Sequence, residues 1–359
     1  MGMSRLTKLS LILRELFRLG SSDGKPNMNQ ILLALKDINI IKLNIKNLGY
    51  QLGQTLMPYL DSIDTISQPT VWNMVSKPTT QNDIESPWFR FWCSELKIAP
   101  IYHRKLWEFA FLLQCLYEQN MLVSGLKGIG FGCGEEPMAS YFASRGIDVL
   151  VTDLELEKVQ GTGWIETGQH ASSLESSYRP ELCTRVEFDQ HVLHAYVDMN
   201  AIPDVYDGQY DFCWSVCAME HLGSIEKGLA FVENSLKTLK PGGIALHTTE
   251  FNYLATDMTI DNWPTVLFLK RHFELLAQSI NAAGHVFFGP SFDTGSGCLD
   301  RFIDLPPYFL GEGLLTKEQW SGVNQGSHLK LSIDGYACTC FGILIKKRLS
   351  GYALTSVAE

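Results

Sequence analysis

The pattern of apolar and polar residues changes near residue 126. Beyond that point, short apolar runs alternate with stretches in which apolar residues recur every three to four positions. The first pattern is typical of buried strands and the second of helices that pack through one face. Their alternation predicts an α/β fold: a doubly wound, mostly parallel seven-stranded sheet with helices on both faces.

The expected strands and helices follow one another in short steps. Helices are predicted at 136–145, within 155–190, at 225–239 and from Pro264 to about 283. The third helix stops at Lys240-Pro241-Gly242-Gly243, because proline and glycine end helices. Strands are predicted at 126–131, 147–152, 194–198, 210–215, 243–249, near 285–288 and at 337–346.

Residues 1–60 are expected to form a separate helical region. A first helix is predicted over 6–19, and the polar segment 21–27 breaks it. Apolar residues then recur in alternating steps of three and four, which is heptad spacing, until Pro58. Such a stripe packs either against another subunit or helical partner, or against the same chain, and both readings stay open. Its members are Ile31, Ala34, Ile38, Ile41, Ile45, Leu48 and Leu52.

The remaining chain divides into a linker and a large domain. Residues 61–104 are expected to be a linker with short elements, because several prolines interrupt it. The domain is predicted over 105–349 and begins with a buried helix at about 105–120. It carries an irregular insert at about 290–335, and loops of that length are usually functional or disordered.

Composition and charge restrict the class of protein. Hydrophobic residues make up 45% of the 359 residues, which suits a large buried core. Neither a membrane span nor a secretory signal is expected, and we predict a cytoplasmic location. The net charge is −10, and residues 1–50 carry eight Lys/Arg against three Asp/Glu, so the rest carries −15. A domain that acidic is a poor match for nucleic acid.

The nine cysteines are scattered and indicate buried free thiols in a reducing compartment. Cys338 and Cys340 form the one close pair, and in a strand they would lie on the same face. Their spacing fits no common zinc pattern, so no metal site is predicted.

The glycines at 128, 130, 132 and 134 fall where the first strand turns into a helix. Without side chains the backbone can bend sharply and approach a ligand, and helix N-terminal amides bind anions. Asp153 ends the second strand, where an acid accepts hydrogen bonds from ribose hydroxyls. These features suit a nucleoside-containing cofactor, but the spacing does not fit the G-x-G-x-x-G fingerprint of dinucleotide sites.

Gly130-Phe131-Gly132-Cys133-Gly134 resembles the first motif of class I S-adenosylmethionine-dependent methyltransferases, which have a Rossmann-like fold. Further elements match that family in order: Asp153, the acid Asp198 after the third strand, Tyr210–Ser215 followed by Glu220-His221, and the turn Leu239–Gly243. The resemblance implies S-adenosylmethionine as cofactor. It implies a site made of Gly130, Gly132, Cys133, Gly134, Asp153, Leu154, Asp198, Met199 and Ser215.

Two positions depart from the family pattern. An acid often stands where this chain has Gly130, and Glu136 replaces the third glycine. The methionine amino group of the cofactor is therefore expected to be held differently, by Glu135 or Glu136. A narrower resemblance, carried by 132–137, 167–174 and 247–252, is to a bacterial methyltransferase group associated with surface-polysaccharide and glycosyltransferase clusters. It implies polysaccharide biosynthesis and a small-molecule or glycan hydroxyl acceptor.

A hydroxyl acceptor benefits from a general base beyond the carboxyl ends of the fourth and fifth strands. Glu250, His221 and Glu220 are the candidates, each against a purely structural role. A metal held by these three is conceivable, although no tight spacing supports it. His170 could form part of a lid over the cofactor, against an ordinary polar loop residue.

Two other functions compete with the methyltransferase. The departures at Gly130 and Glu136 fit a catalytically weak or inactive Rossmann-like scaffold that interacts through the helical N-terminus. A nicotinamide-dependent oxidoreductase would need the glycine spacing that this chain lacks.

Overall fold

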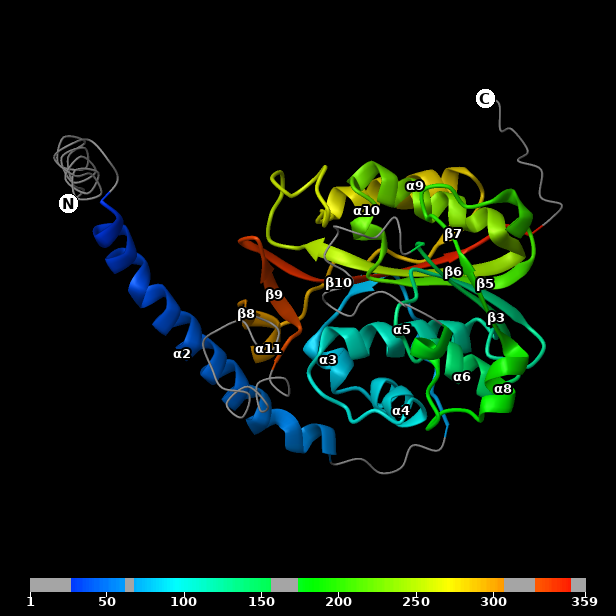
Figure 1. Cartoon of the computed structure of the whole chain (residues 1–359), viewed down its shortest axis with the longest axis horizontal. Coiled ribbons are helices and arrows are strands. Elements are labelled where there is room, and N and C mark those ends of the chain that lie inside the picture. The colour runs from blue at the N-terminus through cyan, green and yellow to red at the C-terminus, as the bar shows by residue number, and fades with distance from the viewer. Residues whose placement is uncertain (1–26, 62–67, 156–173, 307–326, 350–359) are drawn as a thin grey trace.

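The computed structural model describes residues 27–61, 68–155, 174–306 and 327–349 (Figure 1). Helix 6–19 and His170 lie outside these residues. The described helices are α2 Met28–Asp61, α3 Gln81–Ile84, α4 Pro87–Glu95, α5 Arg104–Glu118, α6 Met138–Ser144, α8 Arg185–His191, α9 Ile225–Ser235, α10 Lys270–Ala282 and α11 Cys298–Arg301. Short 3₁₀ turns lie at Leu174–Ser177, Asp204–Tyr206, Met219–His221 and Leu236–Thr238.

One sheet forms the centre of the described chain. Its strands are β1 Lys77–Pro78, β2 Lys127–Phe131, β3 Asp148–Asp153, β4 Val192–Tyr196, β5 Tyr210–Val216, β6 Leu239–Asn252, β7 Val286–Phe287, β8 Ile303–Asp304, β9 Lys330–Ile333 and β10 Tyr336–Lys346. The order is β4-β3-β2-β5-β6-β10-β9-β8, with β1 and β7 also paired to β10. The five neighbouring strands β4, β3, β2, β5 and β6 run parallel to one another, and β10 runs antiparallel to β6.

The prediction of a doubly wound α/β sheet agrees with this topology, but the prediction of seven strands is wrong. The sheet has ten strands within the described residues. The three additions are β1, β8 and β9, which are two to four residues long. A strand of two residues has no periodicity to detect, and β1 contains Pro78, which argues against a strand on sequence grounds. These short strands form by pairing with neighbours: β1 and β9 pair with β10, and β8 pairs with β9.

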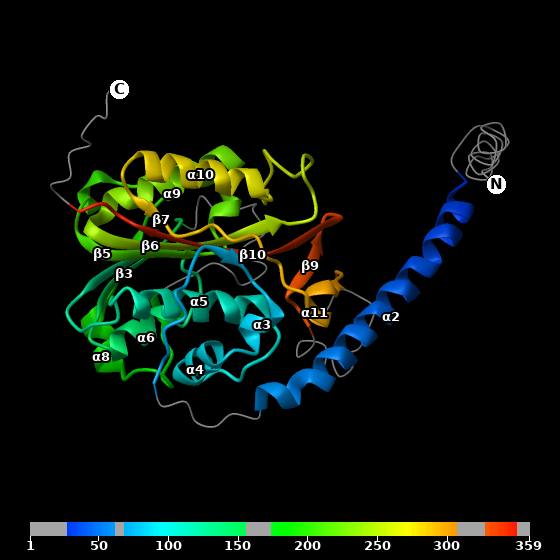
Figure 2. The same ribbon diagram turned by 180° about the vertical axis from the view of Figure 1, so that it is seen from behind.

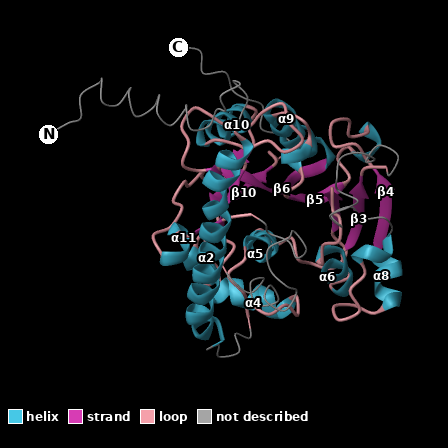
Figure 3. Cartoon of the chain, turned by 60° about the vertical axis from the view of Figure 1, so that its left-hand side comes forward, coloured by secondary structure: helices cyan, strands magenta, loops and turns pink. Residues whose placement is uncertain are grey.

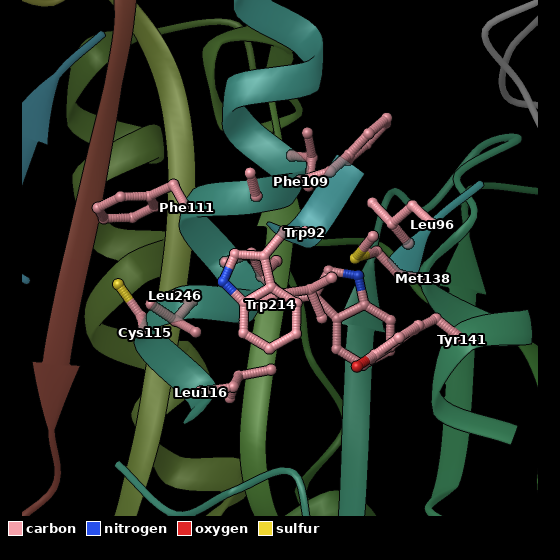
Figure 4. Close-up of a cluster of buried hydrophobic side chains, with 14 of the residues drawn as sticks. Trp92, Leu96, Phe109, Phe111, Cys115, Leu116, Met138, Tyr141, Trp214 and Leu246 are labelled. Atoms are coloured by element: carbon pink, nitrogen blue, oxygen red, sulfur yellow. The ribbon is translucent and has the colours of Figure 1, made fainter. Parts of the chain in front are cut away.

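Helices cover both faces of the sheet. In Figures 1 and 2, α9 and α10 lie on one face, and α3 to α6 with α8 lie on the other. Each layer encloses its own hydrophobic cluster. Figure 4 shows part of the cluster under α4 and α5, where side chains from five elements pack together: Trp92, Leu96, Phe109, Phe111, Cys115, Leu116, Met138, Tyr141, Trp214 and Leu246.

The segment expected as a linker contributes to this core. Its helix α4 begins at Pro87, and Ser86 caps it by accepting a hydrogen bond from Phe89 N. Trp88, Phe89 and Trp92 of α4 are at most 2% exposed. Strand β1 pairs with the middle of β10. Residues 68–104 are therefore built into the domain that follows them.

Helix α2 lies along one edge of the molecule and projects beyond it (Figures 1 and 3). It runs three residues past Pro58, where the apolar stripe was expected to end. Its second half touches the body, where Gly49 packs against the ring of Phe302. Ile38, Ile41 and Leu48 of the predicted stripe are exposed. None of the described helices combines the length and apolar character required to span a bilayer.

Candidate functional site

A cavity of about 740 Å³ opens at the carboxyl ends of the central strands. Strand β2 has its neighbours β3 and β5 on opposite sides, so the chain order reverses there. Ligand sites of open parallel sheets lie outside such a reversal. Ten of the predicted site residues line the cavity: Gly132, Cys133, Gly134, Asp153, Leu154, Asp198, Met199, Glu220, His221 and Glu250.

The turn after β2 is bent in the way the glycine pattern requires. Gly132 and Gly134 have φ angles of +61° and +51°, a region that side chains disfavour. A Cβ on Gly132 would lie 2.8 Å from the Cβ of Ala218, so a side chain here would fill the cleft. Asp153, 6% exposed, accepts hydrogen bonds from Gly134 N at 3.3 Å and Leu154 N at 2.8 Å. The turn and the carboxylate together fit an adenosine-containing cofactor.

Gly130 lies beneath this surface and does not line the cavity. A Cβ at this position would come within 2.3 Å of the Trp214 ring and 2.4 Å of Cys133 Sγ. Both neighbours are buried, and neither can move without leaving a void. An acidic side chain at position 130 would therefore overlap Trp214.

Ser215 also lies away from the cavity wall. Its hydroxyl lies 2.8 Å from Nδ1 of His247, and Nε2 of the same ring lies 3.1 Å from Ser235 Oγ. All three residues are fully buried. Burial lowers the pKa of His247 to about 3, so the ring is neutral and serves to join β5, β6 and α9.

Glu136 lies on the cavity wall where the family has a glycine. Its Oε2 accepts a hydrogen bond of 3.3 Å from the indole of Trp214. Burial raises the pKa of Glu136 well above its usual value, and the charge of Lys105 opposes that rise. A cation placed against this carboxyl would favour its charged form.

Glu250 lies at the other end of the cavity, in an ion pair with Arg104 of α5. Burial raises the pKa of the Glu250 carboxyl, Arg104 opposes this and Glu220 adds to it. Its Oε2 is buried and accepts no hydrogen bond from the described residues. A carboxylate with a raised pKa and one vacant oxygen is suited to accept a proton.

Glu220 and His221 lie on the turn Met219–His221, and the carboxylate of Glu220 lies beside that of Glu250. Glu220 is 1% exposed and its Oε2 accepts a hydrogen bond of 3.0 Å from Thr249. Nδ1 of His221 lies 3.1 Å from the carbonyl oxygen of Pro264. A carbonyl can only accept, so Nδ1 is the donor in this contact.

Several lining residues had no signal in the sequence. They come from α2, from the start of α5 and from the late insert: Lys46, Gly49, Tyr50, Ile101, His103, Arg104, Lys105, Phe302, Ser327 and His328. Lys46 of α2 forms a buried ion pair of 2.5 Å with Asp304, and Asp304 also contacts Nδ1 of His328 at 2.8 Å. The ring of His328 stacks on His103 at 4.7 Å. Distant segments thus meet at this wall.

Comparison with known proteins gives a match to one family model. Residues 106–283 match the model described as a methyltransferase domain. No sequence among the curated proteins matches the chain.

Three solved structures illustrate the structural similarity. The [4+2]-cyclase SpnF is 16% identical, with 84% of this chain and 97% of that chain covered and a TM-score of 0.41. An S-adenosylmethionine-dependent methyltransferase from Aquifex aeolicus is 15% identical, with coverages of 65% and 88% and a TM-score of 0.33. Phosphoethanolamine N-methyltransferase 2 from Haemonchus contortus, in complex with S-adenosyl-L-methionine, is 14% identical, with coverages of 66% and 52% and a TM-score of 0.37.

Scores this low carry no argument about activity, and the family match carries the assignment. Its range begins inside α5 and ends just after α10, so it includes the glycine turn, Asp153 and Glu250. Residues 106–283 are thus similar to a methyltransferase domain, which supports S-adenosylmethionine as the cofactor.

Proposed function

We propose that this protein transfers a methyl group from S-adenosylmethionine to a hydroxyl group of a sugar or glycan-linked small molecule. One observation carries the proposal: the cavity that holds the glycine turn and Asp153 also holds Glu250, whose Oε2 has no hydrogen bond within the described chain. The bound cofactor supplies an activated methyl group on sulfur. The protein then has to orient the acceptor and take up its proton.

The cofactor end would be held by residues around the β2 turn. Asp153 would accept hydrogen bonds from the ribose, and Asp198 lies after β4 on the same wall. The glycine turn itself lines the same space. Glu136 is the group we assign to the cofactor's ammonium, because that cation would offset the burial of the carboxyl.

The acceptor end would use Glu250 as general base. Its raised pKa brings it closer to the value at which a carboxylate accepts a proton efficiently. His221 is the second candidate, since its ring lines the cavity and is oriented by the contact of Nδ1 with the carbonyl oxygen of Pro264. Glu220 is a positioning residue in this scheme, because Thr249 already occupies one of its oxygens.

The wall opposite the cofactor end supports a polyhydroxylated acceptor. It combines aromatic rings of Tyr50, Phe109 and Phe302 with the charged groups of Lys46 and Asp304. Aromatic surface with a few convergent polar groups is usual for small-molecule sites. The resemblance to methyltransferases of polysaccharide clusters supports the same acceptor class.

The test is transfer of a labelled methyl group. The purified chain is incubated with methyl-labelled S-adenosylmethionine and a panel of sugar nucleotides and glycan precursors, and products are identified by mass spectrometry. We expect Glu250→Gln to bind the cofactor normally and to lose about 100-fold or more in turnover. Glu274→Gln, an exposed substitution of the same kind on α10, is the control. Labelling confined to amines, or full turnover of Glu250→Gln, would refute the proposal.

Residues 1–60 are proposed to set the oligomeric state. Ile38, Ile41 and Leu48 expose apolar surface on α2. Light scattering of the full chain and of a chain starting at residue 61 should give different numbers of subunits. An unchanged number of subunits excludes this role.

A further inference from the structure

A cluster of thiols and carboxylates lies next to Glu250, and the methyl-transfer scheme leaves it unused. Cys217 follows β5, Cys340 lies on β10 and Glu108 lies on α5. Their Sγ and carboxylate atoms all lie within 4.8 Å of one another. Cys340 Sγ lies 3.9 Å from Cys217 Sγ and 2.8 Å from Oε1 of Glu108. Cys217 also lines the cavity, so the cluster is reached from the active site.

The sulfur–sulfur distance suits two ligands of one ion. Tetrahedral zinc binds thiolates at about 2.3 Å, which places two such sulfurs about 3.8 Å apart. A disulfide requires the two sulfurs to approach to about 2.05 Å. Cys217 follows β5 and Cys340 stands on β10, and β6 lies between these strands. The two sulfurs therefore lie at a distance that an ion can bridge and that is too long for a disulfide bond.

A second observation points to a missing ligand at the same place. Carboxylate oxygens of Glu220 and Glu250 lie within 4.8 Å of Cys217 Sγ. Glu250 is 4% exposed, and its Oε2 accepts no hydrogen bond from the described residues. A buried carboxylate oxygen without a donor destabilises the fold. A water or hydroxyl group held on an ion beside Cys217 would supply that donor.

We propose that Cys217, Cys340 and Glu108 bind one zinc ion, with the fourth position open to the cavity next to Glu250. Thiolate ligands favour zinc over harder divalent ions, and three protein ligands with one open position are usual for catalytic zinc. Binding converts two thiols to thiolates and releases two protons to solvent. Two thiolates, one carboxylate and Zn²⁺ sum to a charge of −1, which Lys105 offsets, since its Nζ lies 3.5 Å from Glu108 Oε2.

The fourth position connects the ion to the proposed function. A hydroxyl bound to zinc loses its proton more readily than a free one, and Glu250 is placed to receive it. Metal binding itself does not depend on the proposed function, because it requires only the three ligands.

The experiment measures zinc directly on the full chain. Protein stripped with EDTA is dialysed against Zn²⁺ without cofactor or acceptor, and bound metal is measured by mass spectrometry. We expect one zinc per chain, and at least about tenfold weaker binding in Cys217→Ser and in Cys340→Ser. Cys298→Ser, which removes an exposed thiol outside the cluster, should bind like the parent chain. Circular dichroism melting of each variant confirms that it is folded.

Cobalt gives a second readout that depends on sulfur ligation. Co²⁺ in place of Zn²⁺ should show sulfur-to-cobalt charge-transfer absorption in the parent chain and in Cys298→Ser, reduced in both cluster variants. Substoichiometric zinc in the parent chain, or unchanged zinc binding in both folded cluster variants, overturns the proposal. Zinc binding by a chain that transfers no methyl group to any hydroxyl would refute the proposed function alone.

Discussion

The guanidinium of Arg104, at the first residue of α5, forms a buried ion pair with the carboxylate of Glu250 near the end of β6. The same guanidinium lies 3.4 Å from Cys340 Sγ. Arg104 therefore stabilises the charged groups at the acceptor end of the cavity from outside the sheet. The ion pair with Arg104 also explains how the carboxylate of Glu250 can carry a charge although it is buried.

Removing this cation should destabilise the fold. In Arg104→Met the carboxylate of Glu250 stays buried without its partner, so we expect a loss of about 3–5 kcal/mol in the free energy of unfolding. Urea unfolding at pH 7 measures this. The double variant Arg104→Met with Glu250→Gln should recover most of the loss. If it is as unstable as the single variant, the ion pair is not the cause.

Asp153→Ala should weaken cofactor binding by about ten- to a hundredfold, because it removes the acceptor for the ribose and for two backbone amides. Isothermal titration with S-adenosylmethionine measures the change. Asp148→Ala is the matched control, because Asp148 lies at the far end of the same strand and contacts His191. Equal affinity of the two variants would remove Asp153 from the cofactor site.

Gly130→Asp restores the family's acid, yet we expect it to unfold the chain rather than to improve binding. Its Cβ would overlap the buried rings of Trp214, and the smallest such insertion costs about 1–3 kcal/mol. A buried charge adds to that cost. Thermal melting should show a lowered midpoint for Gly130→Ala and a larger drop for Gly130→Asp. A stable Gly130→Asp with tighter cofactor binding would contradict this account of the glycine.

Lys46→Met should loosen α2 without disturbing the sheet. It leaves Asp304 buried without its ion pair, whereas the aliphatic part of the side chain is kept. We expect faster amide exchange in residues 41–56 and unchanged exchange in β2 and β5, measured by hydrogen–deuterium exchange. Lys42→Met, on the same helix, is the control. Equal exchange of Lys46→Met and the parent chain would show that the ion pair does not hold the helix.

Stability should fall in acid through His247. Burial holds the pKa of the folded-state ring at about 3, whereas an unfolded imidazole titrates near 6.5. Between these values the unfolded chain binds a proton that the folded chain does not, so the free energy of unfolding decreases as pH falls from 6.5 toward 3. Between pH 7 and pH 5 this residue should account for about 2 kcal/mol. Urea unfolding of His247→Gln should show a correspondingly smaller loss over that interval.

The donor end of the cavity could be predicted from the sequence because its residues lie in short contiguous motifs. Gly132, Cys133 and Gly134 follow one strand directly, and Asp153 and Asp198 follow the next two. In a parallel sheet the carboxyl ends of strands meet at one edge, so order along the chain already fixes proximity. Which of these residues contact the cofactor stays a prediction.

The acceptor end could not be predicted in the same way. Arg104, Lys46 and His328 come from a helix start, an outlying helix and a late insert. Their meeting depends on how α2 and β8 dock at the sheet edge, which no local periodicity encodes. The thiol cluster shows the same limit, since Cys217, Cys340 and Glu108 stand on three elements and follow no ligand spacing.

The position of α2 has a consequence for which molecules can enter the cavity. The wall formed by Lys46, Gly49 and Tyr50 belongs to a segment outside residues 106–283, which match the family model. Substituting this one helix would reshape the entrance for incoming molecules and leave the donor half of the pocket intact. We therefore expect that replacing residues 28–61 by another helix would change which acceptors are methylated and leave the affinity for the methyl donor unchanged.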